Sequence, residues 1–251
     1  MGNMNDHQDP GELEALLRKK QRELAFAHEC LAKFTYGISH EINSPANTLK
    51  NLLDLLEGDL QGQLDNDTAE LLNMVQRSSQ RLCDTISGML EFSAYCRATN
   101  LKESIDCSVL IKDVLAELAP VIESRCASIT VEPLPVINSS VDSLKILFHH
   151  LIDNALKFTH TEDEAPVIHI AAHARDEGYE FIVSDQGQGV ISEKQDSIFC
   201  VFERLNTQAQ HSGAGIGLAL CRQIVTALGG EIWAEPGESR GSAFHVYLSH
   251  E

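Results

Sequence analysis

Several features that mark common protein classes are absent from this sequence of 251 residues. The N-terminal stretch MGNMNDHQDPGELEALL has no apolar signal core, and no run elsewhere is long and apolar enough to span a bilayer. The seven cysteines are scattered, and they form no C-x-x-C pair of the kind that binds zinc or cycles a disulfide. We therefore expect a soluble protein of a reducing cytoplasm.

Positive charge is scarce. The chain has 19 lysines and arginines against 37 aspartates and glutamates, which gives a formal net charge of −18. The average field of such a surface repels polyanions, so we expect no nucleic acid and no membrane among its partners. The length allows one large domain or two modest ones, each with its own core.

Two common nucleotide-binding signatures are also missing. From Gly213 or Gly215 the G-x-G-x-x-G spacing ends on a leucine, and no glycine-lysine-serine/threonine motif occurs. The sequence therefore predicts neither a Rossmann site nor a P-loop.

The first hundred residues have apolar side chains at helical spacing. They recur every three or four residues from Leu31 to Leu60 and again from Leu71 to Phe92, with the turn-forming stretch GQLDND between the two runs. Residues 1–27 continue the pattern upstream as a charged, coiled-coil-like helical lead-in. Two long helices and a short loop form an antiparallel hairpin whose apolar stripe needs a partner, which predicts a homodimer with a four-helix bundle.

After Asn100 the pattern changes to a mixture of short helices and strands. Helical patterns over 110–122 and 144–156 alternate with the strand-like runs SITVEPL, PVIHIAAHA, YEFIVSD, GEIWAEP and GSAFHVYL. Such a mixture predicts a sheet with helices on one face. The expected fold class is thus α + α/β, with a helical hairpin followed by an α/β sandwich.

One segment of the first helix, ISHEINSP at 38–45, has an unusual composition. His40 lies two residues from each flanking isoleucine, so it is rotated about 200° away from the apolar stripe and points outward. Glu41 can orient the imidazole and take its proton, and Pro45 should bend the helix just beyond it. The segment suits a histidine nucleophile on a bendable helix, although an exposed histidine taken alone is more often a solvated surface residue.

Three segments of the second half suit a nucleotide site. HHLIDNALKFTH carries Asn154 and Lys157 in a helix, VSDQGQGV ends a strand with Asp185 and two glycines, and SGAGIGLALCRQIV opens a helix with three alternating glycines. Glycines at a helix start let backbone N–H groups approach phosphate at the positive end of the helix dipole. In isolation each segment also fits an ordinary core helix or a turn with a helix cap.

Taken in order, these segments resemble the sensor histidine kinase family. HEINSP resembles its phosphoacceptor box, DNALKFT its asparagine box, DQGQG its first glycine box, IFCVFERL its phenylalanine box, GAGIGLALCRQIVTALGGEIW its second glycine box and RGSAF its final glycine-rich element. The resemblance covers the chain from about residue 28 to its end. It implies a dimerisation and histidine phosphotransfer domain over 28–98 and a GHKL-type ATP-binding domain over 104–251.

By similarity, each box gives residues a role. His40 would be the phosphoacceptor, and Glu41 would assist removal of its proton. Asn154 would bind the Mg²⁺ that bridges the ATP phosphates, Lys157 would contact a phosphate, and Asp185 would accept from the adenine amino group. Five glycines would make room for the base or border the triphosphate: Gly187, Gly189, Gly213, Gly215 and Gly217.

Two positions depart from the family pattern. His150 stands where an asparagine is often found, and Ser44 stands where many members have threonine or asparagine. By similarity, Ser44 would help to place the water that hydrolyses the aspartyl phosphate of a response regulator. It fits equally well as a residue that tolerates the bend before Pro45.

The predicted function is an ATP-dependent protein histidine kinase. It would autophosphorylate His40, transfer the phosphoryl group to an aspartate of a response regulator receiver domain, and weakly dephosphorylate that regulator. An ATPase machine of the gyrase, MutL and heat-shock chaperone type needs no histidine on a preceding hairpin, and a catalytically silent phosphotransfer or docking scaffold does not need intact nucleotide boxes. We expect a separate soluble protein to supply sensing, unless the sequence is a piece of a longer chain.

Overall fold

The computed structural model describes residues 42, 45–56, 58, 65–95, 102–159, 164–190, 195–200, 215–237 and 240–249. The predicted lead-in over 1–27 lies outside the described residues. Among the described residues, no helix has the length and apolar character needed to cross a bilayer.

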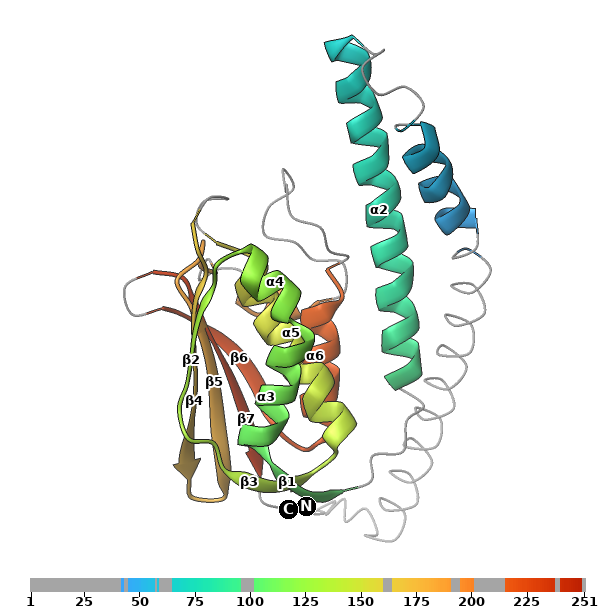
Figure 1. The fold of residues 1–251 in the computed structure, drawn as a ribbon. Helices are drawn as coiled ribbons and strands as arrows, with labels where there is room; N and C mark the ends of the chain where they lie inside the picture. Colours follow the sequence, from blue (N-terminus) through green and yellow to red (C-terminus); the bar gives the residue numbers. More distant parts are fainter. Residues whose placement is uncertain are drawn as a thin grey trace, which may run out of the picture.

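The first part of the structure is a helical hairpin, as predicted (Figure 1). Helical residues 45–56 lie beside α2 (Asn66–Tyr95), whose start is capped by the Asp65 carboxylate, which accepts from the Thr68 N–H at 2.8 Å. Ala46, Cys83 and Ile86 are buried between the two helices. Other apolar side chains of the hairpin stay exposed: Leu49, Leu52, Leu56, Leu71, Val75 and Leu82.

The second part is an α/β sandwich with two sheets. The larger sheet has the strand order β2-β4-β5-β7-β6, in which β2 pairs parallel with β4 and all other pairs are antiparallel; β1 and β3 form a separate antiparallel pair. The strands are β1 (Glu103–Asp106), β2 (Ser128–Val131), β3 (Val136–Ser139), β4 (Val167–Arg175), β5 (Gly178–Asp185), β6 (Glu231–Pro236) and β7 (Ser242–Ser249). The helices are α3 (Cys107–Glu117), α4 (Ala119–Ser124), α5 (Val141–Lys157), α6 (Gly217–Ala227) and the 3₁₀ turn η2 (Ser197–Phe199).

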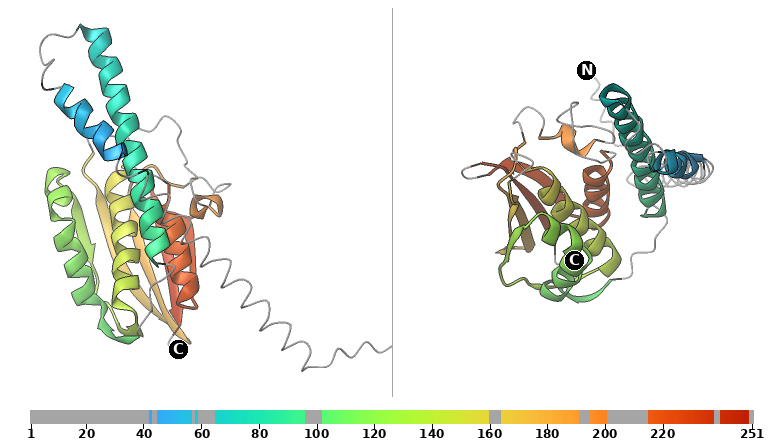
Figure 2. Two further views of the ribbon diagram at one scale, coloured as in Figure 1. Left: turned by 90° about the vertical axis from the view of Figure 1, so that its right-hand side faces the viewer. Right: turned by 45° about the horizontal axis from the view of Figure 1, so that its top comes forward.

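Helices α3, α5 and α6 cover one face of the larger sheet (Figures 1 and 2), and the main core lies between these two layers. Phe148 of α5 meets Phe181 of β5 edge to face, with ring centroids 5.5 Å apart. Each of the five predicted strand-like runs contains one strand of this sheet, so the predicted fold class is confirmed.

The helical pattern predicted over 110–122 is wrong in one respect, because the structure divides it into α3 and α4. Leu118 ends the first helix, and α4 starts with a proline in its first turn. Pro120 has no N–H, so it cannot donate to a carbonyl one turn back and a continuous helix would lose a bond there.

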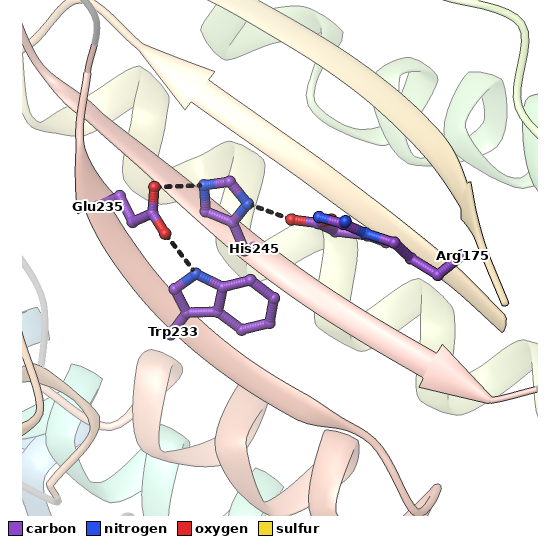
Figure 3. Close-up of polar contacts among 5 residues, drawn as sticks. Arg175, Trp233, Glu235 and His245 are labelled. Atoms are coloured by element: carbon purple, nitrogen blue, oxygen red, sulfur yellow. Dashed lines mark hydrogen bonds and ion pairs between the residues drawn. The ribbon is translucent and has the colours of Figure 1, made fainter. Parts of the chain in front are cut away.

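The other face of the sheet holds a polar cluster that joins four strands (Figure 3). Glu180 is only 3% exposed; its carboxylate accepts from the Arg175 Nε at 2.6 Å and lies 2.7 Å from the His245 Nδ1. Trp233 stacks on the His245 ring at 5.0 Å and donates its indole N–H to Glu235 at 2.9 Å. The cluster ties β4 and β5 to β7 and β6.

This cluster predicts a measurable contribution to stability. Burial raises the pKa of Glu180, but the bonds from His245 and Arg175 outweigh it, so the pKa lies below its ordinary value of 4.5. A carboxyl with a lowered folded pKa stabilises above its unfolded pKa and loses this contribution as the pH falls through the folded pKa.

We expect Glu180→Ala to lower the free energy of unfolding by about 2–3 kcal/mol at pH 7, because Arg175 and His245 lose their buried partner. The difference from the parent should shrink below about pH 4. Urea unfolding at several pH values measures both effects, with exposed Glu177→Ala as the control. Equal stability of all three proteins at pH 7 would contradict the assignment.

Candidate ATP-binding site

Helix α5 presents the predicted asparagine and lysine at its C-terminal end. Its apolar face is buried in the core, and Ser140 caps its start by accepting from the Ser143 N–H. Asn154 is half-buried, and Lys157 donates to Asp153 at 2.5 Å, one turn earlier on the same helix. The lysine is therefore held near the end of α5 by an acidic neighbour rather than extended into solvent.

Asp185 lies at the end of β5 with a fixed carboxylate. Its Oδ1 accepts from the Gly187 N–H at 2.7 Å and from the Ser242 N–H at 3.3 Å. Burial raises the pKa of this carboxyl above its ordinary value, against the opposing effect of these two bonds. Among the described residues both N–H bonds end on Oδ1, so Oδ2 is the oxygen that can accept from a ligand.

Two glycines allow the backbone to pass close to the ends of α5 and β5. A Cβ on Gly187 would lie 1.9 Å from the Phe158 carbonyl oxygen, and Gln188 donates its N–H to that same oxygen. Gly241 has a φ of +79°, and a Cβ there would lie 2.0 Å from the Asp185 carbonyl oxygen. Side chains at these positions would collide with backbone, so both glycines are needed to bring the three segments together.

The start of α6 lies against the middle of α5. A Cβ on Gly217 would be 3.1 Å from the His150 Nδ1, and Gly215 has a φ of +69°. Ile216 occupies the N-cap position and makes no side-chain cap bond. Among the described residues, no side chain caps the first N–H groups of α6, which lie at the positive end of the helix dipole. Gly217 at this helix start faces His150, one turn before Asn154 along α5.

The structure therefore brings most of the predicted pocket residues to one end of the sandwich. Gly187 contacts the end of α5 through Phe158, Gly189 approaches Gly241, and Gly217 contacts α5 through His150. Four predicted site residues lie outside the described residues: His40, Glu41, Ser44 and Gly213.

Two further residues belong to this site by geometry. Gly241 and Ser242 support the Asp185 carboxylate from the start of β7, although sequence reasoning gave them no role. The signal that could have found them is the glycine of RGSAF immediately before the last strand.

A metal at this site would depend on few protein ligands. No group of three or more histidine, cysteine, aspartate or glutamate side chains that could hold a metal occurs within the described ranges. An asparagine amide oxygen is a hard ligand of the kind Mg²⁺ accepts, and Mg²⁺ in nucleotide sites takes its other ligands largely from phosphates and water. Asn154 at the end of α5 fits that limited role.

Two family models match the chain. One describes a "His Kinase A (phospho-acceptor) domain" and matches residues 31–95; the other describes a "Histidine kinase-, DNA gyrase B-, and HSP90-like ATPase" and matches residues 139–251. Together they cover both parts of the predicted architecture in the predicted order.

Curated relatives match nearly the whole chain. Cyanobacterial phytochrome A of Nostoc sp. is 32% identical over 239 residues, which are 93% of this chain and 31% of that protein. The adaptive-response sensory kinase SasA of Synechococcus sp. (strain JA-3-3Ab) is 30% identical over 92% of this chain and 63% of its own length. The chain thus spans about a third of the phytochrome and less than two thirds of the sensory kinase.

Solved structures share the fold. Full-length ShkA in complex with AMPPNP has a TM-score of 0.62 at 24% identity, covering 86% of this chain and 46% of that one. The histidine kinase AdeS of Acinetobacter baumannii has a TM-score of 0.56 at 19% identity, covering 84% of this chain and 98% of that one. From the two matched domains and these relatives, the chain belongs to the sensor histidine kinase family.

Proposed function

We propose that this protein is an ATP-dependent protein histidine kinase that phosphorylates itself on His40 and transfers the phosphoryl group to an aspartate of a response regulator receiver domain. The observation that carries the proposal is the meeting of Asp185, the end of α5 and the uncapped start of α6, in a chain whose preceding hairpin contains HEINSP. The match to a phosphoacceptor domain over 31–95 argues against an ATPase machine, and the match to an ATPase domain over 139–251 argues against a silent scaffold.

In this proposal ATP lies between α5, β5 and α6. Asp185 accepts from the adenine amino group through Oδ2, while Gly187 and Ser242 hold Oδ1. The phosphates lie at the start of α6, bordered by Gly213, Gly215 and Gly217. Lys157 contacts a phosphate after leaving Asp153, and Gly189 with its positive φ shapes the loop that follows Asp185.

Asn154 is the proposed protein ligand of Mg²⁺, which when bound would neutralise charge on the phosphates. The chain's own residues perform the transfer. A ring nitrogen of His40 forms a bond to the γ-phosphorus as the bond from that phosphorus to the β,γ-bridging oxygen breaks, and ADP leaves. Glu41 takes the proton that the imidazole loses. In the reverse direction Ser44 helps to place the water that hydrolyses the regulator's aspartyl phosphate.

We also propose a cytoplasmic location, because free cysteine thiols are typical of a reducing compartment. Cys83, Cys107 and Cys221 are buried and free, and burial raises the pKa of Cys107 to about 12, so its thiol stays protonated and unreactive.

A second copy of the chain is the proposed partner of the hairpin. Leu52 of the first helix and Leu71 of α2 are 58% and 61% exposed, and they belong to the larger set of exposed apolar side chains described above. Such a stripe on a two-helix hairpin is buried when two hairpins form a four-helix bundle.

We expect sedimentation equilibrium to find a homodimer at micromolar concentration. Leu71→Asp should weaken dimerisation at least about 10-fold, because it would bury an unpaired charge in the bundle. Glu70→Asp, a conservative change at the neighbouring exposed position, is the control. A monomeric parent protein would contradict the proposed assembly.

The chemistry of the product tests the proposed activity. Incubation with γ-labelled ATP and Mg²⁺ should label the protein, and the label should be lost in acid and survive alkali, as expected of a phosphoramidate. An acid-stable label, or none, would contradict a histidine kinase.

A further inference from the structure

The hairpin and the ATP-binding domain are in direct contact at one glycine. Helices α2 and α6 lie side by side in both Figure 1 and Figure 2. A Cβ built on Gly88 of α2 would lie 3.1 Å from the Ile216 Cδ1 and 3.3 Å from its Cβ. Ile216 is 3% exposed, although it precedes α6 at the edge of its domain. Its side chain is therefore seated on α2.

The glycine has no evident value for α2 itself. Gly88 lies inside a 30-residue helix, where glycine costs about 1 kcal/mol relative to alanine. A second helical glycine, Gly58, has open space around an added Cβ. At Gly88 the missing side chain instead makes room for a residue from the other domain.

Ile216 links this contact with α2 to the proposed ATP pocket. It lies between Gly215 and Gly217, which border the proposed phosphate position, and it is the N-cap residue of α6. Its side chain contacts α2, while the backbone around it forms the uncapped helix start. A shift of Ile216 on α2 must therefore move the phosphate end of the pocket relative to the hairpin.

The contact between Gly88 and Ile216 also lies at a position along the hairpin that is suitable for transfer to His40. Ala46 packs against Cys83 and Ile86, so these residues define one level of the two antiparallel helices. Gly88 lies two residues beyond Ile86, and His40 lies six residues before Ala46 in the sequence. In the predicted antiparallel continuation of the hairpin, both fall on the same side of that level.

We propose that Gly88 and Ile216 are positioning residues, whose contact holds the phosphate end of the ATP pocket against the hairpin for transfer to His40. The inference rests on the proposed function, because it needs His40 to be the acceptor. Ile216 acts through the placement of α6, and Gly88 acts by admitting Ile216.

A volume exchange tests the contact. Gly88→Ala adds a Cβ at 3.1 Å from the Ile216 Cδ1, and Ile216→Val removes that same carbon. We expect Gly88→Ala to slow single-turnover autophosphorylation about 10-fold and Ile216→Val about 3-fold, both with an unchanged Kd for Mg-ATP. The double variant should recover to within about 3-fold of the parent.

Gly58→Ala is the matched control, since its added Cβ meets nothing within 4 Å. A purely structural effect of alanine would be similar at both glycines and would stabilise the helix, whereas we expect slower transfer only at Gly88. Unchanged rates in both single variants, or a double variant as slow as Gly88→Ala, would overturn the proposal. A parent protein that labels no histidine would instead overturn the proposed function, and with it this inference.

A cross-link separates a productive contact from an inhibitory one. Cysteines at both positions, Gly88→Cys with Ile216→Cys, would have Cβ atoms about 3.3 Å apart, close to the disulfide range of about 3.5–4.5 Å. We expect oxidation to join the two peptides in a mass spectrum, and the cross-linked protein to label within about 3-fold of its reduced form. Failure to cross-link, or labelling that appears only after reduction, would overturn the positioning role.

Discussion

His40→Gln is expected to abolish phosphorylation of the protein while its Kd for Mg-ATP stays within about 2-fold of the parent value. Glutamine has an amide nitrogen whose lone pair is delocalised, so it cannot attack phosphorus as a neutral imidazole does. The proposed ATP ligands all belong to the other matched domain, over residues 139–251, so the pocket keeps its groups.

Labelling with γ-labelled ATP and calorimetric titration with an ATP analogue measure the two quantities separately. His173→Gln is the matched control, because His173 is exposed on β4. Retained labelling in His40→Gln would remove His40 as the acceptor.

Asp185→Asn is expected to weaken ATP binding about 100-fold and to reverse the preference between purine bases. The asparagine oxygen can keep the bonds from Gly187 and Ser242, which in the parent end on Oδ1. Its amide nitrogen then replaces Oδ2 and places a donor opposite the adenine amino donor, a loss of about 1.5–3 kcal/mol for a charged bond with an added mismatch.

Inosine triphosphate has a carbonyl oxygen where adenine has the amino group, so the variant should bind it better than ATP. Competition against a fluorescent nucleotide measures both affinities, with Asp176→Asn in the exposed β4–β5 turn as control. An unchanged order of affinities would exclude Asp185 as the adenine acceptor.

The elements that were predictable from sequence are those with local patterns. The strand-like runs and the amphipathic repeat of α5 recur at fixed spacing, and the order of the five boxes predicted the family that the comparisons confirm. The pair β1 and β3 was missed, since each strand has only four residues and no clear alternation of burial.

The contacts that shape the site could not be predicted in this way. The closeness of Gly187 to Phe158 and of Gly241 to Asp185 depends on how distant segments pack, and no local periodicity encodes it. Glu180 occupies an alternating strand position that predicts an exposed side chain, yet it is only 3% exposed and is bonded to Arg175 and His245. The contact of Ile216 with Gly88 joins two domains, and no local sequence pattern in either domain predicts it.

The most direct test of the central claim is to locate the phosphoryl group. The protein is incubated with ATP and Mg²⁺, kept at alkaline pH, digested, and sequenced by mass spectrometry with a fragmentation method that preserves phosphoramidates. We predict one phosphorylated peptide, modified at His40 within ISHEINSP, and its loss in Asp185→Asn at an ATP concentration that saturates only the parent. A phosphoryl group on another residue, or the same His40 peptide in both proteins at that concentration, would contradict the account.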